Sequence, residues 1–216
     1  MNPTTRRTPP ADSFDVPIRA VIFDMGNVVL PFDHMRAAHA AAANSDLSPR
    51  AVYDRVFGSG LVARYDLGAV GTRAFLKAAR EAVGFRGALA DLRRCWNEIF
   101  HPSPAMERLV HRLAGRYRLV LLSNTNRSHF EYARRTYPII RTFRRRVLSY
   151  EVGLAKPDPA IYRLAVAKAG VPADACLYID DIPAYTAAAA DLGIRAVTFR
   201  GVTDLRRRLR RAGLRP

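Results

Sequence analysis

Residues 18–30 read IRAVIFDMGNVVL, an apolar run that reaches Asp24 and is followed by a glycine and an asparagine. Continuous β-branched and aliphatic runs bounded by turn signals are typical of parallel strands that are buried on both faces. Similar runs occupy 118–122, 176–179 and 195–199. The sequence therefore predicts at least four buried strands, the first of which ends at a carboxylate.

Helical patterns separate the last three of these strands. The segments 127–135, 158–169 and 183–192 begin at polar residues or proline, and the last two end at a glycine. Strands that alternate with helices are typical of an α/β fold with a doubly wound parallel sheet. We expect that fold class here.

The stretch between the first and the second strand is far longer than a crossover needs, and it carries no strand signal. Ser48 followed by Pro49 is a typical helix start within it. Helical patterns lie near 34–43, 49–57, 71–83 and 88–100. An all-helical insertion is the economical interpretation.

These patterns divide the chain into three parts. We expect a disordered tail over 1–15, a core formed by 16–33 together with 105–216, and a helical cap over 34–104. A chain of 216 residues is long enough for one large domain or for a core with such an inserted module.

The composition, 49% hydrophobic and 25% charged, is typical of a soluble globular protein. No apolar run is long enough to span a bilayer, and the basic N-terminal segment has no hydrophobic stretch behind it. We expect a cytoplasmic monomer or homodimer. The two cysteines, Cys95 and Cys176, are expected to be core residues, because two thiols cannot staple a chain of this length.

The net charge of +16 raises the question of a nucleic-acid partner. The excess is spread along the chain, is nearly all arginine, and lacks interleaved aromatic residues. Two clusters stand out, 141–146 and 206–211, and the second reads as a solvated helical face with Thr203 as N-cap and Gly213 past its end. A solvated surface is favoured over nucleic-acid binding.

Four polar signals stand at or near the ends of apolar runs. They are Asp24, Ser123-Asn124, Lys156 and Asp180-Asp181. Ligands of open α/β sheets bind outside the carboxyl ends of the strands, so the topology brings these groups to one edge. Each alone has an ordinary interpretation as a turn or cap residue. Their coincidence predicts a reaction centre.

Charge counting indicates what completes this centre. Three close carboxylates, Asp24, Asp180 and Asp181, repel one another unless cations offset them. Lys156 supplies one positive charge and a divalent ion two, which favours Mg²⁺, a hard ion held by carboxylates and substrate phosphate. Asp24 then attacks phosphorus, and Ser123 and backbone N–H groups bind the transferred group. The predicted reaction is hydrolysis of a small phosphorylated substrate.

The runs VIFDMGNVVL, LLSNTN, GLAKPD and YIDD resemble the four motifs of the haloacid dehalogenase-like superfamily. The residues within these motifs are similar to those of its bacterial α-D-glucose-1-phosphate phosphatase branch. The resemblance implies a Rossmann-like core, a helical cap, Mg²⁺ dependence, and a sugar phosphate, including a sugar 1-phosphate, as substrate. It also implies residue roles: Asp24 as nucleophile, Ser123 and Lys156 as phosphate ligands, and Asp180 and Asp181 around the metal. Asn124 is a further candidate for substrate binding, and Asp24 and the Gly26 carbonyl are further candidates for the metal.

One departure from the superfamily pattern concerns the general acid. Many members carry an aspartate two residues after the nucleophile, and this chain carries Gly26. Such a proton donor contributes about 10²–10⁴-fold to rate. Asp33 or His34 from the start of the cap is a candidate replacement, although Asp33 is also a typical helix N-cap. Alternatively, the enzyme uses activated leaving groups such as anomeric hydroxyls.

Substrate contacts from the cap are harder to predict. The candidates are Phe32, His34, Arg64, Tyr65 and Trp96, with His34 favoured among them. Arg127 is a candidate for a substrate anion or an exposed helix start. Tyr185 stands where relatives often carry asparagine, and the simplest expectation is that it packs against the sheet.

Two other functions remain open from the sequence. A 2-haloacid dehalogenase would explain the missing acid, since halide leaves without a proton, but it gives Asp180-Asp181 no purpose. A non-catalytic protein that binds nucleic acid or an acidic partner through its arginines would have no use for Asp24 and Lys156.

Overall fold

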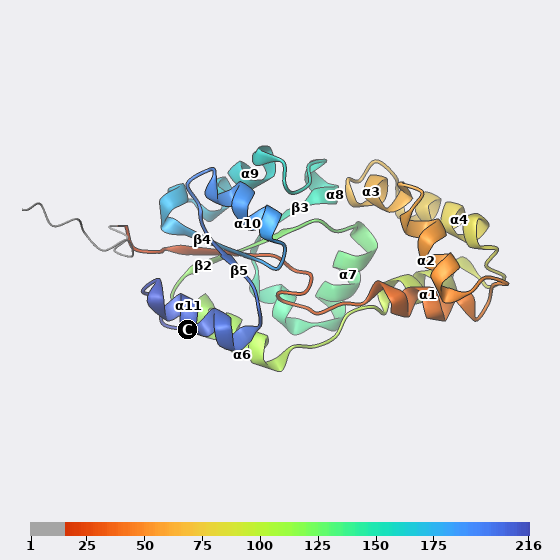
Figure 1. Cartoon of the computed structure of the whole chain (residues 1–216), viewed down its shortest axis with the longest axis horizontal. Coiled ribbons are helices and arrows are strands. Elements are labelled where there is room, and N and C mark those ends of the chain that lie inside the picture. Colours follow the sequence, from red (N-terminus) through yellow and green to blue (C-terminus); the bar gives the residue numbers. More distant parts are fainter. Residues whose placement is uncertain (1–15) are drawn as a thin grey trace, which may run out of the picture.

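The computed structural model describes residues 16–216, which fold around a five-stranded sheet (Figure 1). The strand order is β3-β2-β1-β4-β5, and all neighbouring strands are parallel. The strands are β1 (Ala20–Phe23), β2 (Arg118–Ser123), β3 (Arg145–Leu148), β4 (Cys176–Asp180) and β5 (Arg195–Thr198). The predicted α/β class with a parallel sheet is confirmed.

Helices cover both faces of the sheet, which explains why β1 is apolar at every position. Val21 and Phe23 pack into the hydrophobic cluster on one face, and Ala20 and Ile22 pack into the cluster on the other. One face is covered by α6 (Pro104–Ala114), α7 (Arg127–Thr136) and α11 (Val202–Arg211), and the other by α9 (Pro159–Ala169) and α10 (Pro183–Ala190) (Figure 1). The sheet is therefore doubly wound.

Five helices between β1 and α6 form a helical cap at one end of the molecule (Figure 1). It has its own hydrophobic cluster, in which Phe75 and Trp96 are buried. The Ser48 hydroxyl accepts a hydrogen bond from the Ala51 N–H, so the predicted cap of that helix is confirmed. The helices are α1 (His34–Ala42), α2 (Pro49–Phe57), α3 (Leu61–Asp66), α4 (Thr72–Val83) and α5 (Leu89–Asn97).

Several elements escaped prediction. Strand β3 has four residues and begins with Arg145 and Arg146, so it lacks the apolar run that predicts a buried strand. Helix α3 has only six residues and starts after a left-handed Gly60 instead of a side-chain cap. The short elements η1 (Pro138–Thr142), α8 (Ser149–Val152) and η2 (Ala173–Ala175) and the longer α6 were also not predicted.

The C-terminal helix corrects one expectation. Thr203 is not its N-cap: α11 begins at Val202, and the cap is Gly201, whose φ of 100° suits a residue without a side chain. The helix buries Leu205 and Leu209 and leaves most of its arginines in solvent, as expected for a solvated face.

Three further expectations concern the chain as a whole. Cys95 and Cys176 are free thiols; Cys176 is buried and Cys95 is partly buried. Within residues 16–216, no helix combines the length and the apolar character that crossing a membrane requires. The expected tail over 1–15 lies outside the described residues.

Candidate active site

The carboxyl ends of the three central strands meet at one pocket. β1 lies between β2 and β4, and these strands are followed by or end in Asp24, Ser123 and Asp180. Asp24, Ser123 and Lys156 line a cavity of about 160 Å³, together with Asp181. The sheet topology thus brings together segments that are more than 130 residues apart in sequence.

Lys156 links two of the carboxylates. Its ammonium nitrogen Nζ lies 2.8 Å from Asp24 Oδ1 and 2.6 Å from Asp180 Oδ2, and its side chain is 2% exposed. Burial alone would lower the pKa of Lys156, but the two carboxylates outweigh burial and raise it. The lysine therefore stays protonated and carries a fixed positive charge in the pocket.

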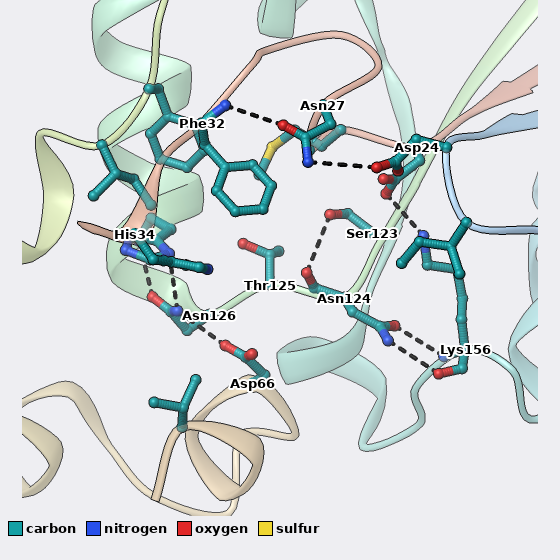
Figure 2. A pocket seen from close by; sticks show the side chains of 18 of the residues that line it. Asp24, Asn27, Phe32, His34, Asp66, Ser123, Asn124, Thr125, Asn126 and Lys156 are labelled. Atoms are coloured by element: carbon teal, nitrogen blue, oxygen red, sulfur yellow. Dashed lines mark hydrogen bonds and ion pairs between the residues drawn. The ribbon is translucent and has the colours of Figure 1, made fainter. Parts of the chain in front are cut away.

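Asn124 holds the backbone that carries Lys156. Its amide nitrogen donates to the Lys156 carbonyl at 3.1 Å, and its carbonyl oxygen accepts from the Lys156 N–H at 2.9 Å (Figure 2). Both ends of the Asn124 side chain are occupied in this way. Asn124 lines the pocket, and its side chain positions the lysine.

The carboxylates form a compact acidic group. Asp24, Asp180 and Asp181 each offer an oxygen within 4.8 Å of the other two. Burial raises the pKa of Asp24, Lys156 opposes this shift, and Asp180 adds to it. Burial and the neighbouring Asp180 likewise raise the pKa of Asp181. Three hard oxygen donors around one lysine leave an excess of negative charge, which suits a divalent cation such as Mg²⁺.

Asp180 and Asp181 differ in how they face this group. Asp180 is fully buried and accepts hydrogen bonds from the Tyr178 hydroxyl, from Lys156 and from the Ile182 N–H. Asp181 lines the pocket and accepts a weak hydrogen bond from Asn27 Nδ2 at 3.4 Å. Asp180 is thus held in place by protein donors, and Asp181 is the more accessible carboxylate.

Gly26 has no room for a side chain. A Cβ atom built at this position would lie 2.6 Å from Cε1 of Phe32, so the phenyl ring occupies the space that an acid would need. The Phe32 backbone N–H donates a hydrogen bond to Asn27 Oδ1 (Figure 2). Asn27 adopts a left-handed conformation with φ of 55°. Neither role of Asn27 was predicted, although asparagine is one of the residues enriched in that conformation.

Two other predicted residues lie outside the pocket. Asp33 is the N-cap of α1, with Oδ1 accepting from the Met35 N–H at 2.8 Å, and it is not among the pocket residues. Arg127 is exposed, lies 3.6 Å from Glu131 and stacks over the Tyr150 ring, away from the pocket. Both match the ordinary interpretations of those residues.

His34 lines the pocket within an aromatic group. Its ring centroid lies 4.6 Å from that of Phe57 and 4.7 Å from that of Phe32. Burial lowers the pKa of His34 to about 4, so the ring is neutral near pH 7. Among the other cap candidates, Trp96 lines the pocket, whereas Tyr65 is buried and its hydroxyl bonds to Thr72.

Tyr185 packs against the sheet as expected and also contacts the lysine. Its ring is partly buried in the hydrophobic cluster around Tyr162. The Lys156 ammonium lies 4.9 Å from the centroid of the Tyr185 ring, within the range of a cation–π interaction. The aromatic ring therefore lies where it can stabilise the charged lysine.

Asp66 is a pocket residue that was not predicted from the sequence. It ends α3, and its Oδ1 accepts a hydrogen bond from Asn126 Nδ2 at 2.9 Å (Figure 2). Burial raises the pKa of Asp66 to about 6, and the Asn126 hydrogen bond opposes the shift. Since α3 itself was not predicted, no sequence signal placed this carboxyl at the pocket.

The sequence profile of the haloacid dehalogenase-like hydrolases matches residues 18–193. Solved structures with the same fold include a HAD family enzyme from Bacteroides thetaiotaomicron in complex with magnesium and inorganic phosphate. That structure is 24% identical, covers 85% of this chain and 94% of its own, and superposes with a TM-score of 0.77.

Two further structures represent other relatives. A predicted HAD-like family hydrolase from Porphyromonas gingivalis is 23% identical, with coverage of 89% of this chain and 98% of its own and a TM-score of 0.76. A 2-haloacid dehalogenase from Pseudomonas syringae is 19% identical, with coverage of 83% and 85% and a TM-score of 0.60.

Proposed function

Because the chain belongs to the haloacid dehalogenase-like hydrolases, we propose that it is a Mg²⁺-dependent phosphatase that hydrolyses a small phosphorylated metabolite. The observation that carries the proposal is the acidic group of Asp24, Asp180 and Asp181 around Lys156. Displacement of halide needs no such concentration of oxygen donors. The expected substrates are sugar phosphates, sugar 1-phosphates included.

The proposed first step is nucleophilic attack by Asp24. A carboxylate oxygen forms a bond to phosphorus, the bond from phosphorus to the leaving oxygen breaks, and the alcohol departs with a proton from water. Lys156, held against Asp24, offsets the negative phosphoryl oxygens, and Ser123 lies at the pocket wall where its hydroxyl can donate to them. A water molecule then cleaves the aspartyl-phosphate, releases phosphate and restores Asp24.

Asp24, Asp181 and the Gly26 carbonyl, with Asp180 behind them, would hold Mg²⁺, which would supply positive charge to offset the phosphoryl oxygens. The chain supplies the matching negative charge. Three carboxylates and one ammonium sum to −2 when ionised, which is the charge that one divalent ion offsets.

Gly26 limits which leaving groups the proposed enzyme can use efficiently. With the Phe32 ring filling the space beside it, no carboxyl from this position can protonate the departing oxygen. Leaving groups that need little protonation, such as the anomeric hydroxyl of a sugar 1-phosphate, are therefore favoured. Comparing turnover of a sugar 1-phosphate and the matching 6-phosphate tests this step, and equal or faster turnover of the 6-phosphate would refute it.

The main test is a phosphate-release screen over small phosphorylated metabolites, run with Mg²⁺ and with EDTA. We expect Mg²⁺-dependent release that the Asp24→Asn variant reduces to background. Asp54→Asn, an exposed change in α2, is the matched control and should retain wild-type activity. Phosphate release that survives Asp24→Asn unchanged would remove the nucleophile from this mechanism.

Dehalogenation is the second candidate, favoured by the missing acid at Gly26. The same preparation assayed for halide release from a 2-haloacid separates the two reactions. Halide release that is insensitive to EDTA, without phosphate release from any metabolite, would establish the dehalogenase instead.

A further inference from the structure

Asp66 belongs to the wall of the pocket that lies across from the nucleophile. Figure 2 shows Asp66 and Asn126 on one side of the pocket and Asp24 and Lys156 on the other, with Thr125 between them. Asp66 comes from the helical cap, whereas Asn126 precedes α7 of the core. A substrate whose phosphate lies beside Asp24 would extend its alcohol part toward this wall.

The backbone of Asp66 is fixed to the core. The Ser149 hydroxyl donates to the Asp66 carbonyl, and Ser149 Oγ accepts from the Thr125 N–H at 2.9 Å. Two residues later, the chain passes so close to α8 that a Cβ atom at Gly68 would lie 2.3 Å from the Tyr150 carbonyl oxygen. Asp66 is thus held by the contact between cap and core, which gives its side chain a defined position.

The carboxylate of Asp66 has unused hydrogen-bonding capacity. Its Oδ1 accepts from Asn126, while Oδ2 has no hydrogen-bond partner and no ion pair among residues 16–216. An ionised carboxylate can accept about four hydrogen bonds, and Asp66, which is partly buried, has reduced access to water to supply them. Because its pKa is about 6, Asp66 is mostly ionised above neutral pH and requires donors from whatever fills the pocket.

Asn126 cannot supply those donors. Its amide nitrogen already bonds to both Asp66 and His129, and its oxygen accepts from the His129 N–H. Asn126 therefore positions Asp66 and leaves Oδ2 for a ligand.

Apolar side chains also line the cavity, beside polar ones such as Thr125 and His129. Trp96, Phe32, Phe100 and Val62 line the same cavity as Asp66. An apolar wall with a few placed polar groups is the usual composition of a site for a small molecule. A carboxylate beside aromatic rings suits a ligand with both C–H faces and hydroxyl groups. A simple aryl or alkyl group would leave Asp66 without donors.

We propose that Asp66 is a specificity-determining residue that accepts hydrogen bonds from hydroxyl groups of the leaving alcohol, so that the substrate is a phosphate ester of a polyhydroxylated alcohol such as a hexose. The inference rests on the phosphatase function proposed above. It concerns the opposite end of the substrate from the phosphate, and it can fail while that function holds.

The test compares two substrates in three proteins. Glucose 1-phosphate carries hydroxyl groups on its leaving alcohol, whereas phenyl phosphate carries none. Wild-type protein, Asp66→Asn and the exposed cap control Asp46→Asn are assayed on both with Mg²⁺. Asparagine keeps the size of Asp66 and can still accept from Asn126, so the fold should persist, and Asp66→Ser repeats the test with a smaller side chain.

We expect both Asp66 variants to lower kcat/KM for glucose 1-phosphate by about 10- to 100-fold, the usual effect of losing a hydrogen bond to a charged group. The loss should lie mainly in KM. Turnover of phenyl phosphate should stay within about 3-fold, and Asp46→Asn should match wild type on both substrates. Inhibition by free glucose should also weaken in the Asp66 variants.

Each other result overturns the inference. Equal losses on both substrates, or no loss on either, would show that Asp66 does not select the alcohol. Wild-type turnover of phenyl phosphate without turnover of any hexose phosphate would do the same and leave the phosphatase function standing. Wild-type protein that releases phosphate from neither substrate class would refute both proposals.

Discussion

At the scale of single residues, Lys156 shows how the pocket keeps a charged group without solvent. The ammonium contacts Asp24 and Asp180 and lies over the Tyr185 ring. A buried ion pair is stable only when its remaining contacts are favourable, and an aromatic face is one such contact. The tyrosine therefore acts through the lysine, as a positioning residue.

Two substitutions of Tyr185 distinguish the contribution of its aromatic ring from that of its hydroxyl group. Tyr185→Phe keeps the aromatic face and should leave kcat/KM for phosphate release within about 2-fold of wild type. Tyr185→Leu removes the cation–π interaction, which contributes on the order of 1–2 kcal/mol at desolvated sites, and should lower kcat/KM by about tenfold. Steady-state kinetics of the two variants measure the difference. Identical rates for Phe and Leu would rule out the aromatic contact.

Gly26 leads to a second prediction at this scale. Gly26→Ala places a methyl group against the Phe32 ring and should destabilise the fold by about 1–3 kcal/mol, as overpacking usually does. Phe32→Ala opens that space, so the double variant should be less destabilised than the sum of the two single changes. Urea unfolding of the four proteins measures this coupling. Strictly additive free energies would mean that the ring moves aside without resistance.

At the scale of elements, the site depends on where cap helices meet core helices. Trp96 of α5 stacks on His129 of α7 with ring centroids 4.6 Å apart, and His129 Nε2 donates to the Trp96 carbonyl. His129 Nδ1 accepts from Asn126, so its ring is the neutral Nε2–H tautomer. Burial lowers the pKa of His129 to about 3 and that of His34 to about 4. Both rings favour a neutral, dry contact between cap and core.

This contact should make stability depend on pH. The pKa of His34 is about 4 in the folded protein and 6.5 in an unfolded chain, so the unfolded state binds more protons between these values. The contribution of neutral His34 to the free energy of unfolding is fully present above pH 6.5, and it declines as the pH falls toward 4. The free energy of unfolding of His34→Phe minus that of wild type should therefore be about 2 kcal/mol larger at pH 5 than at pH 8.

Urea unfolding at the two pH values checks this difference. Asp66 has a raised pKa and contributes with the opposite sign over pH 4–6, but it is present in both proteins and cancels in the comparison. A difference between His34→Phe and wild type that is the same at pH 5 and pH 8 would contradict the buried, neutral state of His34.

The element scale also shows which parts of the molecule the sequence predicts. The strands β1, β2 and β4 are apolar because helices cover both faces, and that same pattern locates Asp24, Ser123 and Asp180 at one edge. Helix α3 has too few residues for a periodic pattern and no side-chain cap, so Asp66 stayed hidden. Which cap residues line the pocket depends on contacts between cap and core. Local patterns do not encode those contacts.

At the scale of the whole molecule, the charge at the pocket is opposite in sign to the net charge of the chain. The chain has a net charge of +16, yet Asp24, Asp180 and Asp181 form an acidic group at the pocket. The exposed arginines of α11 pair in part with Asp204 and otherwise face solvent. The acidic group is therefore a local feature that the net charge conceals, and its natural counter-ion is a small cation.

Binding of that cation should stabilise the folded protein. An ion that binds only the folded state raises stability by RT ln(1 + [L]/Kd), about 2.7 kcal/mol at one hundred times Kd. We expect Mg²⁺ to raise the Tm of wild-type protein relative to EDTA by several degrees, because a protein of this size gains about 2–4 °C per kcal/mol. Differential scanning fluorimetry measures the shift without any substrate.

Asp181 is the carboxylate with which to test this effect. It lines the pocket, whereas Asp180 is fully buried and held by Tyr178, Lys156 and the Ile182 N–H. Asp181→Asn should abolish most of the Mg²⁺ shift without unfolding the protein, since Asp181 has only a weak hydrogen bond to lose. Asp174→Asn, in η2 and outside the pocket, should keep the full shift. An equal shift in wild type and Asp181→Asn would place the cation elsewhere and remove the electrostatic basis for phosphate hydrolysis at this pocket.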